Sequence, residues 1–88
     1  MRVKVRLYAL LKDLYGSSED VIDIQSERVT VRNILDYLSL KNDKIKRFLE
    51  SRGESIITLV NGIYAPHETE LKDGDTIDLL PPASGGSL

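Results

Sequence analysis

The sequence contains no cysteine and no tryptophan, and it has a single histidine, His67. Without cysteine the chain can form no disulfide, and it has no thiol nucleophile, no persulfide carrier and no thiolate ligand for zinc. The histidine lies in the polar run Pro66-His67-Glu68, which predicts a solvated loop residue and not a catalytic base. Since a catalytic triad would need a positioned base, we expect no active site built from this chain alone.

An excess of charge of one sign is also missing, because 12 basic and 14 acidic side chains leave a formal net charge of −2. Such a balance gives little electrostatic attraction to a phosphate backbone, so nucleic acid is not an expected partner. No apolar run approaches the ~20 residues of a membrane span, and residues 1–4 open a strand pattern instead of a signal peptide. We therefore expect a cytoplasmic protein that does not contact a membrane.

The chain length of 88 residues, of which 41% are hydrophobic and 30% charged, is enough for one small core. We predict one domain over residues 1–82. Residues 83–88, Ala-Ser-Gly-Gly-Ser-Leu, are mostly small and have almost nothing to bury. They therefore predict a flexible C-terminal tail.

Alternation of apolar and polar residues predicts strands near both ends of the domain. In residues 2–8, inward valine and leucine side chains alternate with basic ones, which is the period of a half-buried strand. Residues 76–80 alternate in the same way, and Pro81 and Pro82 end that strand because they lack backbone donors. Further strands are predicted over residues 20–25, 55–60 and 63–65, with turns at Asn61-Gly62 and at residues 72–75.

Apolar residues at helical spacing predict one main helix and two smaller ones. The main helix is expected over residues 30–40, where the apolar side chains form one stripe behind Thr30, which can cap the free amide groups. A short helix is expected over residues 9–15 and another from Asn42 or Asp43, ending at Gly16 and Gly53 respectively.

This order of elements is typical of an α+β fold in which one mixed sheet packs on one main helix. The β-grasp, or ubiquitin-like, fold has this shape, with the first and last strands parallel and side by side at the centre of the sheet. On the outer face of the sheet, Arg2, Lys4 and Arg6 are expected to be neutralised mainly by cross-strand pairing with Asp78.

An acidic run near a glycine turn contains the oxygen ligands that calcium prefers; its members are Glu68, Glu70, Asp73, Asp75 and Asp78. Their spacing does not match a calcium-binding loop, and Asp-Gly-Asp is also a sequence that a tight turn prefers. We therefore predict a turn with a solvated face and no metal site.

The residues after the last predicted strand have a second possible use. Gly85 and Gly86 carry no side chain, so an extended segment over residues 82–86, roughly 16 Å long, can thread a narrow channel. The end of this segment could present an unhindered carboxylate to the active site of a partner enzyme. Composition alone leaves open whether the glycine pair has this use or belongs to a plain tail.

Residues 71–86, LKDGDTIDLLPPASGG, resemble the closing motif of the β-grasp sulfur carriers, above all the small subunit of molybdopterin synthase. The resemblance spans nearly the whole chain, since it includes Tyr8-Ala9 after the first strand, Thr30-Val31 at the start of the main helix, and Leu59-Val60-Asn61-Gly62. The motif is fairly specific for the superfamily and does not choose among its members.

The resemblance implies a carrier subunit that binds no cofactor and works inside a synthase complex. An adenylating, ubiquitin-activating-like enzyme would use ATP and Mg to activate Gly86, which would then carry the thiocarboxylate that donates sulfur in molybdenum cofactor biosynthesis. Gly85 would provide steric clearance. The implied partners are this enzyme and the large subunit of molybdopterin synthase.

Ser87 and Leu88 follow the glycine pair, whereas in the family pattern the second glycine is the last residue. The Gly86 carbonyl is therefore an amide in this sequence, and activation would require a processing protease to remove both residues. Alternatively, the two residues are not native, or this member of the family is not activated in this way.

Four apolar residues near the start of the predicted tail are candidate partner contacts: Tyr8, Leu80, Pro81 and Pro82. Outward apolar side chains on a sheet face often mark a docking site, although scattered surface residues give the same pattern. Two other functions stay open. One is a ubiquitin-like modifier conjugated to lysines, or donating sulfur for transfer RNA thiolation, through Gly86; the other is a β-grasp binding module that is not activated.

Overall fold

The central pair of strands joins the two ends of the folded domain, as seen in the computed structural model, which describes residues 1–82. The strands are β1 (Arg2–Leu7), β2 (Glu19–Asp23), β3 (Ile57–Val60), β4 (Ile63–Tyr64) and β5 (Thr76–Leu80). The helices are α1 (Leu10–Tyr15), α2 (Val31–Lys41) and α3 (Asp43–Arg52), followed by a 3-10 turn, η1 (Gly53–Ser55). The predicted tail, residues 83–88, lies outside the described residues.

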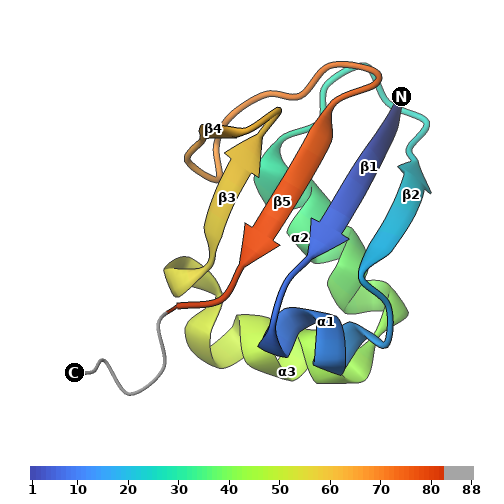
Figure 1. The fold of residues 1–88 in the computed structure, drawn as a ribbon. Coiled ribbons are helices and arrows are strands. Elements are labelled where there is room, and N and C mark those ends of the chain that lie inside the picture. The colour runs from blue at the N-terminus through green and yellow to red at the C-terminus, as the bar shows by residue number, and fades with distance from the viewer. Residues whose placement is uncertain (83–88) are drawn as a thin grey trace.

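The five strands form one mixed sheet in the order β2-β1-β5-β3-β4. β1 and β5 are parallel, whereas β1 with β2, β3 with β5 and β3 with β4 are antiparallel. Figure 1 shows β1 and β5 side by side at the middle of the sheet, with α2 behind it and with α1 and α3 beyond the carboxyl ends of the central strands. The predicted architecture and the central parallel pair are therefore confirmed.

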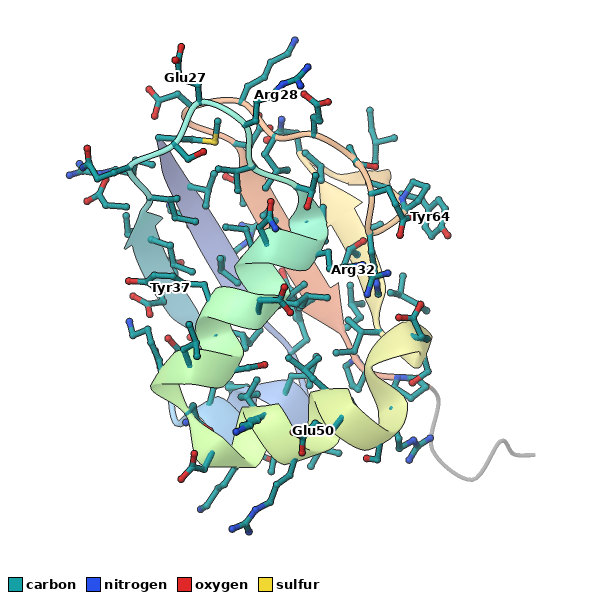
Figure 2. The ribbon with its side chains drawn as sticks, turned by 180° about the vertical axis from the view of Figure 1, so that it is seen from behind. Glu27, Arg28, Arg32, Tyr37, Glu50 and Tyr64 are labelled. Atoms are coloured by element: carbon teal, nitrogen blue, oxygen red, sulfur yellow. The ribbon has the colours of Figure 1, made fainter. Side chains whose placement is uncertain are left out.

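The core lies between α2 and the face of the sheet that the strand alternation makes apolar (Figure 2). Val5 and Ile77, which are paired in the β1–β5 register, and Ile34 and Leu38 of α2 have no exposed surface. Each such side chain stabilises the fold by about 1.5–3 kcal/mol when it leaves water. The two central strands thus depend on the same apolar contacts with α2.

The helix boundaries follow from side chains that satisfy free backbone groups. Thr30 and Asn33 form a reciprocal capping box at the start of α2, with Asn33 N donating to Thr30 Oγ1 (3.2 Å) and Thr30 N donating to Asn33 Oδ1 (2.9 Å). Asn42 caps α3 by accepting from the amide of Ile45 (2.9 Å). α1 ends at Gly16, which has a left-handed conformation (φ 87°), as predicted.

One strand starts later than its β-branched composition predicts. Residues 55 and 56 were expected in the strand over 55–60, but η1 includes Ser55, and the amide of Ile56 donates to the carbonyl of Gly53 (3.2 Å). The prediction was wrong because this 3-10 turn, at the end of α3, directs the Ile56 side chain into the core. β3 therefore begins at Ile57.

Candidate functional site

The described chain ends beside the point where the first strand turns into α1. Leu7 is paired with Leu79 in the parallel register, and the amide of Tyr8 donates to the carbonyl of Leu79 (3.2 Å). Because Leu7 and Leu79 face the core, Tyr8 and Leu80 follow them on the opposite, outer face of the sheet. The central pair therefore sets these two apolar side chains next to each other.

A groove of about 490 Å³ opens at this place. It is lined by the end of the first strand and start of α1, by α3, and by the residues after β5; the lining residues are Tyr8, Ala9, Leu10, Phe48, Arg52, Leu80, Pro81 and Pro82. We call it the exit groove, since the last described residue, Pro82, forms part of its wall. All four residues predicted as partner contacts lie on it, and their role in docking stays a prediction.

The walls of the exit groove are mostly apolar and accessible. Tyr8 and Leu10, which both line the groove, are 40% and 46% exposed. Ala9 between them has a positive φ of 51°, a conformation that is uncommon for a residue with a side chain. The backbone at this junction is thus held in a strained form that presents both neighbours to the groove.

Four residues of the groove were not among the predicted partner contacts: Ala9, Leu10, Phe48 and Arg52. Phe48 is one of the apolar residues at helical spacing in the helix predicted from Asn42 or Asp43, so this residue had a signal. What the sequence did not show is that α3 packs against α1 at the carboxyl end of the sheet, which brings its last turn to the prolines (Figure 1).

A buried carboxylate lies on the outer sheet face beside the groove. Asp78 Oδ1 accepts hydrogen bonds from Arg6 Nε (2.7 Å) and from the hydroxyl of Tyr8 (3.2 Å), and Asp78 Oδ2 accepts from Arg6 Nη2 (3.3 Å). The hydrogen bond with Asp78 raises the pKa of Arg6. The predicted pairing of Arg6 with Asp78 is confirmed, and the Asp78 side chain, only 9% exposed, also holds the phenol ring that forms one groove wall.

The other two basic residues of β1 pair with a different strand from the one predicted. Arg2 Nε lies 3.2 Å from Asp23 Oδ1, and Lys4 Nζ lies 3.7 Å from Glu19 Oε2, both on β2. The physical reason is the register, which sets Arg2 opposite Asp23 and leaves Asp78 within reach of Arg6 alone. The basic stripe is thus neutralised within the sheet.

His67 is not the solvated loop residue that its sequence neighbours predicted. It is 9% exposed, and its Nε2 lies 3.0 Å from the carbonyl oxygen of Ile56. The loop folds back on the sheet because the amide of Arg32 donates to the carbonyl of His67 (2.9 Å), which ties the loop to the first turn of α2. His67 therefore has a structural role in joining this loop to the start of β3.

A second, smaller cavity of about 180 Å³ adjoins His67. Its cation, Arg32, reaches out from α2 (Figure 2) and lies 3.0 Å from Glu54 Oε2 and 3.0 Å from Glu68 Oε2. Both carboxylates line the same cavity. The charge of Arg32 is therefore balanced by two carboxylates, whereas the described residues that line the exit groove include no carboxylate.

Asp73 and Asp75 of the acidic run form turn contacts, as predicted, whereas Asp78 is buried and does not belong to a solvated face. Asp75 Oδ2 accepts from the amide of Lys72 (2.8 Å), Asp75 Oδ1 accepts from Asn61 Nδ2 (2.9 Å), and Asp73 Oδ1 accepts from the amide of Arg2 (2.7 Å). Among residues 1–82 the structure has no group of three or more side chains arranged to hold a metal ion. In the same part of the chain, no helix has the length and apolar character needed to cross a membrane.

The residues predicted to carry the chemistry, Gly85 and Gly86, lie outside the described residues, as do Ser87 and Leu88. What the structure describes is the body that precedes them. The exit groove includes the paired prolines at the end of that body, and Asp78 lies four residues before Pro82 in the sequence.

A mixed five-stranded sheet with parallel central strands, packed on one main helix, defines a β-grasp domain of the ubiquitin-like class. A family model described as the ThiS family matches residues 5–86. The chain therefore belongs to the ThiS family of β-grasp sulfur carriers.

Relatives with different names share this fold and length. The molybdopterin synthase sulfur carrier subunit of Haemophilus influenzae is 30% identical over 84 residues, covering 96% of this chain and 99% of that protein. The small archaeal modifier protein 1 of Methanosarcina acetivorans is 34% identical, covers 97% of this chain and 96% of its own, and has a TM-score of 0.78. In a complex of subunits 1 and 2 of the molybdopterin-converting factor from Helicobacter pylori, one chain is 25% identical, with 98% and 100% coverage and a TM-score of 0.63.

Proposed function

We propose that this sulfur carrier serves as the small subunit of molybdopterin synthase and that Gly86 carries the sulfur. The observation that carries the proposal is the extent of the family match, which runs through the glycine pair and stops at Gly86, two residues before Leu88. The similarity to the Haemophilus influenzae carrier over nearly all of both chains supports the choice of synthase. Gly85, which has no side chain, provides clearance in a narrow channel.

The proposed chemistry takes place at the main-chain end and in partner proteins. Once a protease has hydrolysed the bond between Gly86 and Ser87, the Gly86 carboxylate attacks the α-phosphorus of ATP on an adenylating enzyme that uses Mg, and pyrophosphate leaves. A sulfur nucleophile at the oxidation level of sulfide then displaces AMP and leaves a thiocarboxylate. ATP and Mg belong to the partner enzyme, and we place the whole sequence of reactions in the cytoplasm.

The exit groove gives the partner a place to hold the carrier while its end reacts. Tyr8, Leu80, Pro81 and Pro82 form a surface of accessible apolar side chains immediately before the carrier segment. Apolar side chains near the centre of an interface supply much of the binding free energy. Docking here would fix the direction in which residues 83–86 enter the large subunit.

The test is the intact mass of the protein isolated from its native host. We expect loss of Ser87 and Leu88, together with a fraction of molecules in which one oxygen has been replaced by sulfur. A variant that also lacks Gly86 is the matched control and should never gain sulfur, although it should keep the same fold. Recovery of the full-length, unmodified chain alone would contradict the proposal.

A second function is favoured by the similarity to a small archaeal modifier protein. In this case Gly86 would form an isopeptide bond with lysines of other proteins, or donate sulfur for transfer RNA thiolation. Lysine adducts that end in Gly-Gly would support conjugation, whereas a stable complex with the large subunit would support the synthase. Persistence of Ser87 and Leu88 in the mature protein would point instead to a β-grasp binding module that is not activated.

A further inference from the structure

The exit groove contains one charged residue among the described residues that line it, Arg52. Its side chain is exposed at the end of α3, with the guanidinium carbon 5.9 Å from the centre of the Phe48 ring. Within residues 1–82 it takes part in no ion pair. A guanidinium that stacks on an aromatic ring keeps its edge N–H groups available to an acceptor.

Arg52 is one of seven basic side chains without a carboxylate partner within residues 1–82, and among them it alone lines the exit groove. Five basic side chains have carboxylate partners: Arg2, Lys4, Arg6, Arg32 and Lys41. α3 contains four basic and two acidic residues, although the whole chain has a net charge of −2, and none of the four basic residues is ion-paired in the described part of the chain. The groove therefore lies against a locally positive helix.

A basic residue in the last turn also stabilises a helix through its dipole. This effect accounts for a positive charge near residue 52 in general. The helix dipole does not favour one side of the helix end over another. It therefore does not explain why the guanidinium lies in an apolar groove, where a charged group is less well hydrated than in open solvent. The position of Arg52 over the Phe48 ring, in the groove that the prolines also line, is thus a feature of the groove and not of the helix alone.

We propose that the exit groove receives an acidic segment of the synthase large subunit, which inserts an apolar side chain between Tyr8 and Pro81 and pairs an aspartate or glutamate with Arg52. This inference rests on the proposed function. The apolar walls match the side chain, and the unpaired guanidinium matches a carboxylate, with which it can form two parallel hydrogen bonds. The positive surface of α3 would also speed the encounter with an acidic partner.

The test measures the affinity of the full chain for the large subunit of the same host by titration calorimetry at low and high salt. We expect Arg52→Glu to weaken binding by at least about tenfold and to reduce its salt dependence, and Arg52→Lys to lose less. Arg47→Glu is the matched control, because Arg47 is an exposed residue of the same helix that does not line the groove. It should weaken binding by no more than about threefold.

Three other results would overturn the inference, each for a different reason. Equal losses in Arg52→Glu and Arg47→Glu would show long-range attraction without a site in the groove. If Arg52→Glu shifted the amide resonances of residues 83–88 in the free chain, the groove would hold the chain's own end instead of a partner segment. Unchanged affinity in Arg52→Glu would refute the inference alone, whereas failure of the unmodified chain to bind the large subunit would refute the proposed synthase function.

Discussion

Arg6 of β1 and Asp78 of β5 face each other across the central parallel pair, and the Asp78 carboxylate also accepts a hydrogen bond from Tyr8. This contact links the strand register to the wall of the exit groove. A shift of the register would separate both donors from the carboxylate. The same pairing that closes the fold therefore sets one wall of the exit groove, which includes Pro82, the last described residue.

Removing the carboxylate should destabilise the domain. Asp78→Ala is expected to lower the free energy of unfolding by about 1–3 kcal/mol, because it removes a nearly buried acceptor from two donors. Arg6→Ala should cost at least as much, since it leaves the nearly buried Asp78 carboxylate without its cation, whereas the 45% exposed Arg6 can be hydrated when Asp78 is removed. Urea unfolding of both variants and of the double variant measures the coupling; additive losses would contradict a direct interaction.

Substitution of the turn glycine between β3 and β4 should be costly. Asn61 and Gly62 have φ values of 52° and 85°, which a two-residue hairpin turn requires. Gly62→Ala is expected to destabilise the fold by about 1 kcal/mol because alanine is strained at positive φ. Gly53→Ala is the matched control, since Gly53 is right-handed and a new Cβ would meet Leu49 at an ordinary 3.6 Å. An equal loss in both variants, measured by thermal unfolding, would show that the positive φ is not the cause.

The burial of His67 predicts that its replacement is costly. His67→Ala should lower the free energy of unfolding by about 1–3 kcal/mol, because it leaves a cavity and removes the contact with the Ile56 carbonyl. Glu70→Ala, on the same loop but exposed, should change it by less than about 0.5 kcal/mol. A solvated histidine would make the two substitutions equally mild, and chemical denaturation distinguishes these outcomes.

The pH dependence of stability should include a contribution from Asp20. Burial alone would raise the pKa of Asp20, but hydrogen bonds from Tyr15 and Lys41 outweigh it and hold the pKa below its usual value. Since the pKa is lower in the folded chain than the ~3.9 of an unfolded aspartate, this stabilisation is present above about pH 4 and is lost as the pH falls through the folded value.

Asp20→Asn should therefore reduce the free energy of unfolding by about 1 kcal/mol near neutral pH and by less in acid. The measurement is denaturant unfolding of both proteins over a series of pH values. Asp36→Asn, a change at an exposed residue of α2 that forms no ion pair with the described residues, is the control. A difference that stayed constant down to acid pH would argue against a depressed pKa at Asp20.

The sequence predicted the parts of this fold that depend on local chemistry. Short-range patterns determine caps, turns and buried faces. They therefore predicted the Thr30 cap, the turn at Asn61-Gly62 and the alternation in β1 and β5. The prediction for His67 failed because its burial depends on a loop that binds α2 through backbone atoms, which no side-chain pattern reveals.

The candidate site was predictable in part, for the same reason. Tyr8 and Leu80 could be assigned to one sheet face once the first and last strands were paired, and the two prolines follow directly. Arg52 could not, since only the packing of α3 across the end of the sheet brings it there. The pairing of the first and last strands follows from their alternation and from the order of elements, whereas no pattern in the sequence places α3 against α1.

Because β5, the last strand among the described residues, lies at the centre of the sheet, β1 has no parallel neighbour until residues 76–80 have been synthesised. A nascent chain on the ribosome can form local helices, but it cannot close its core before residues 76–80 emerge. The segment that would react follows this strand directly. A sulfur-loading enzyme that recognises the finished body would thus meet a reactive end only on molecules that have already folded.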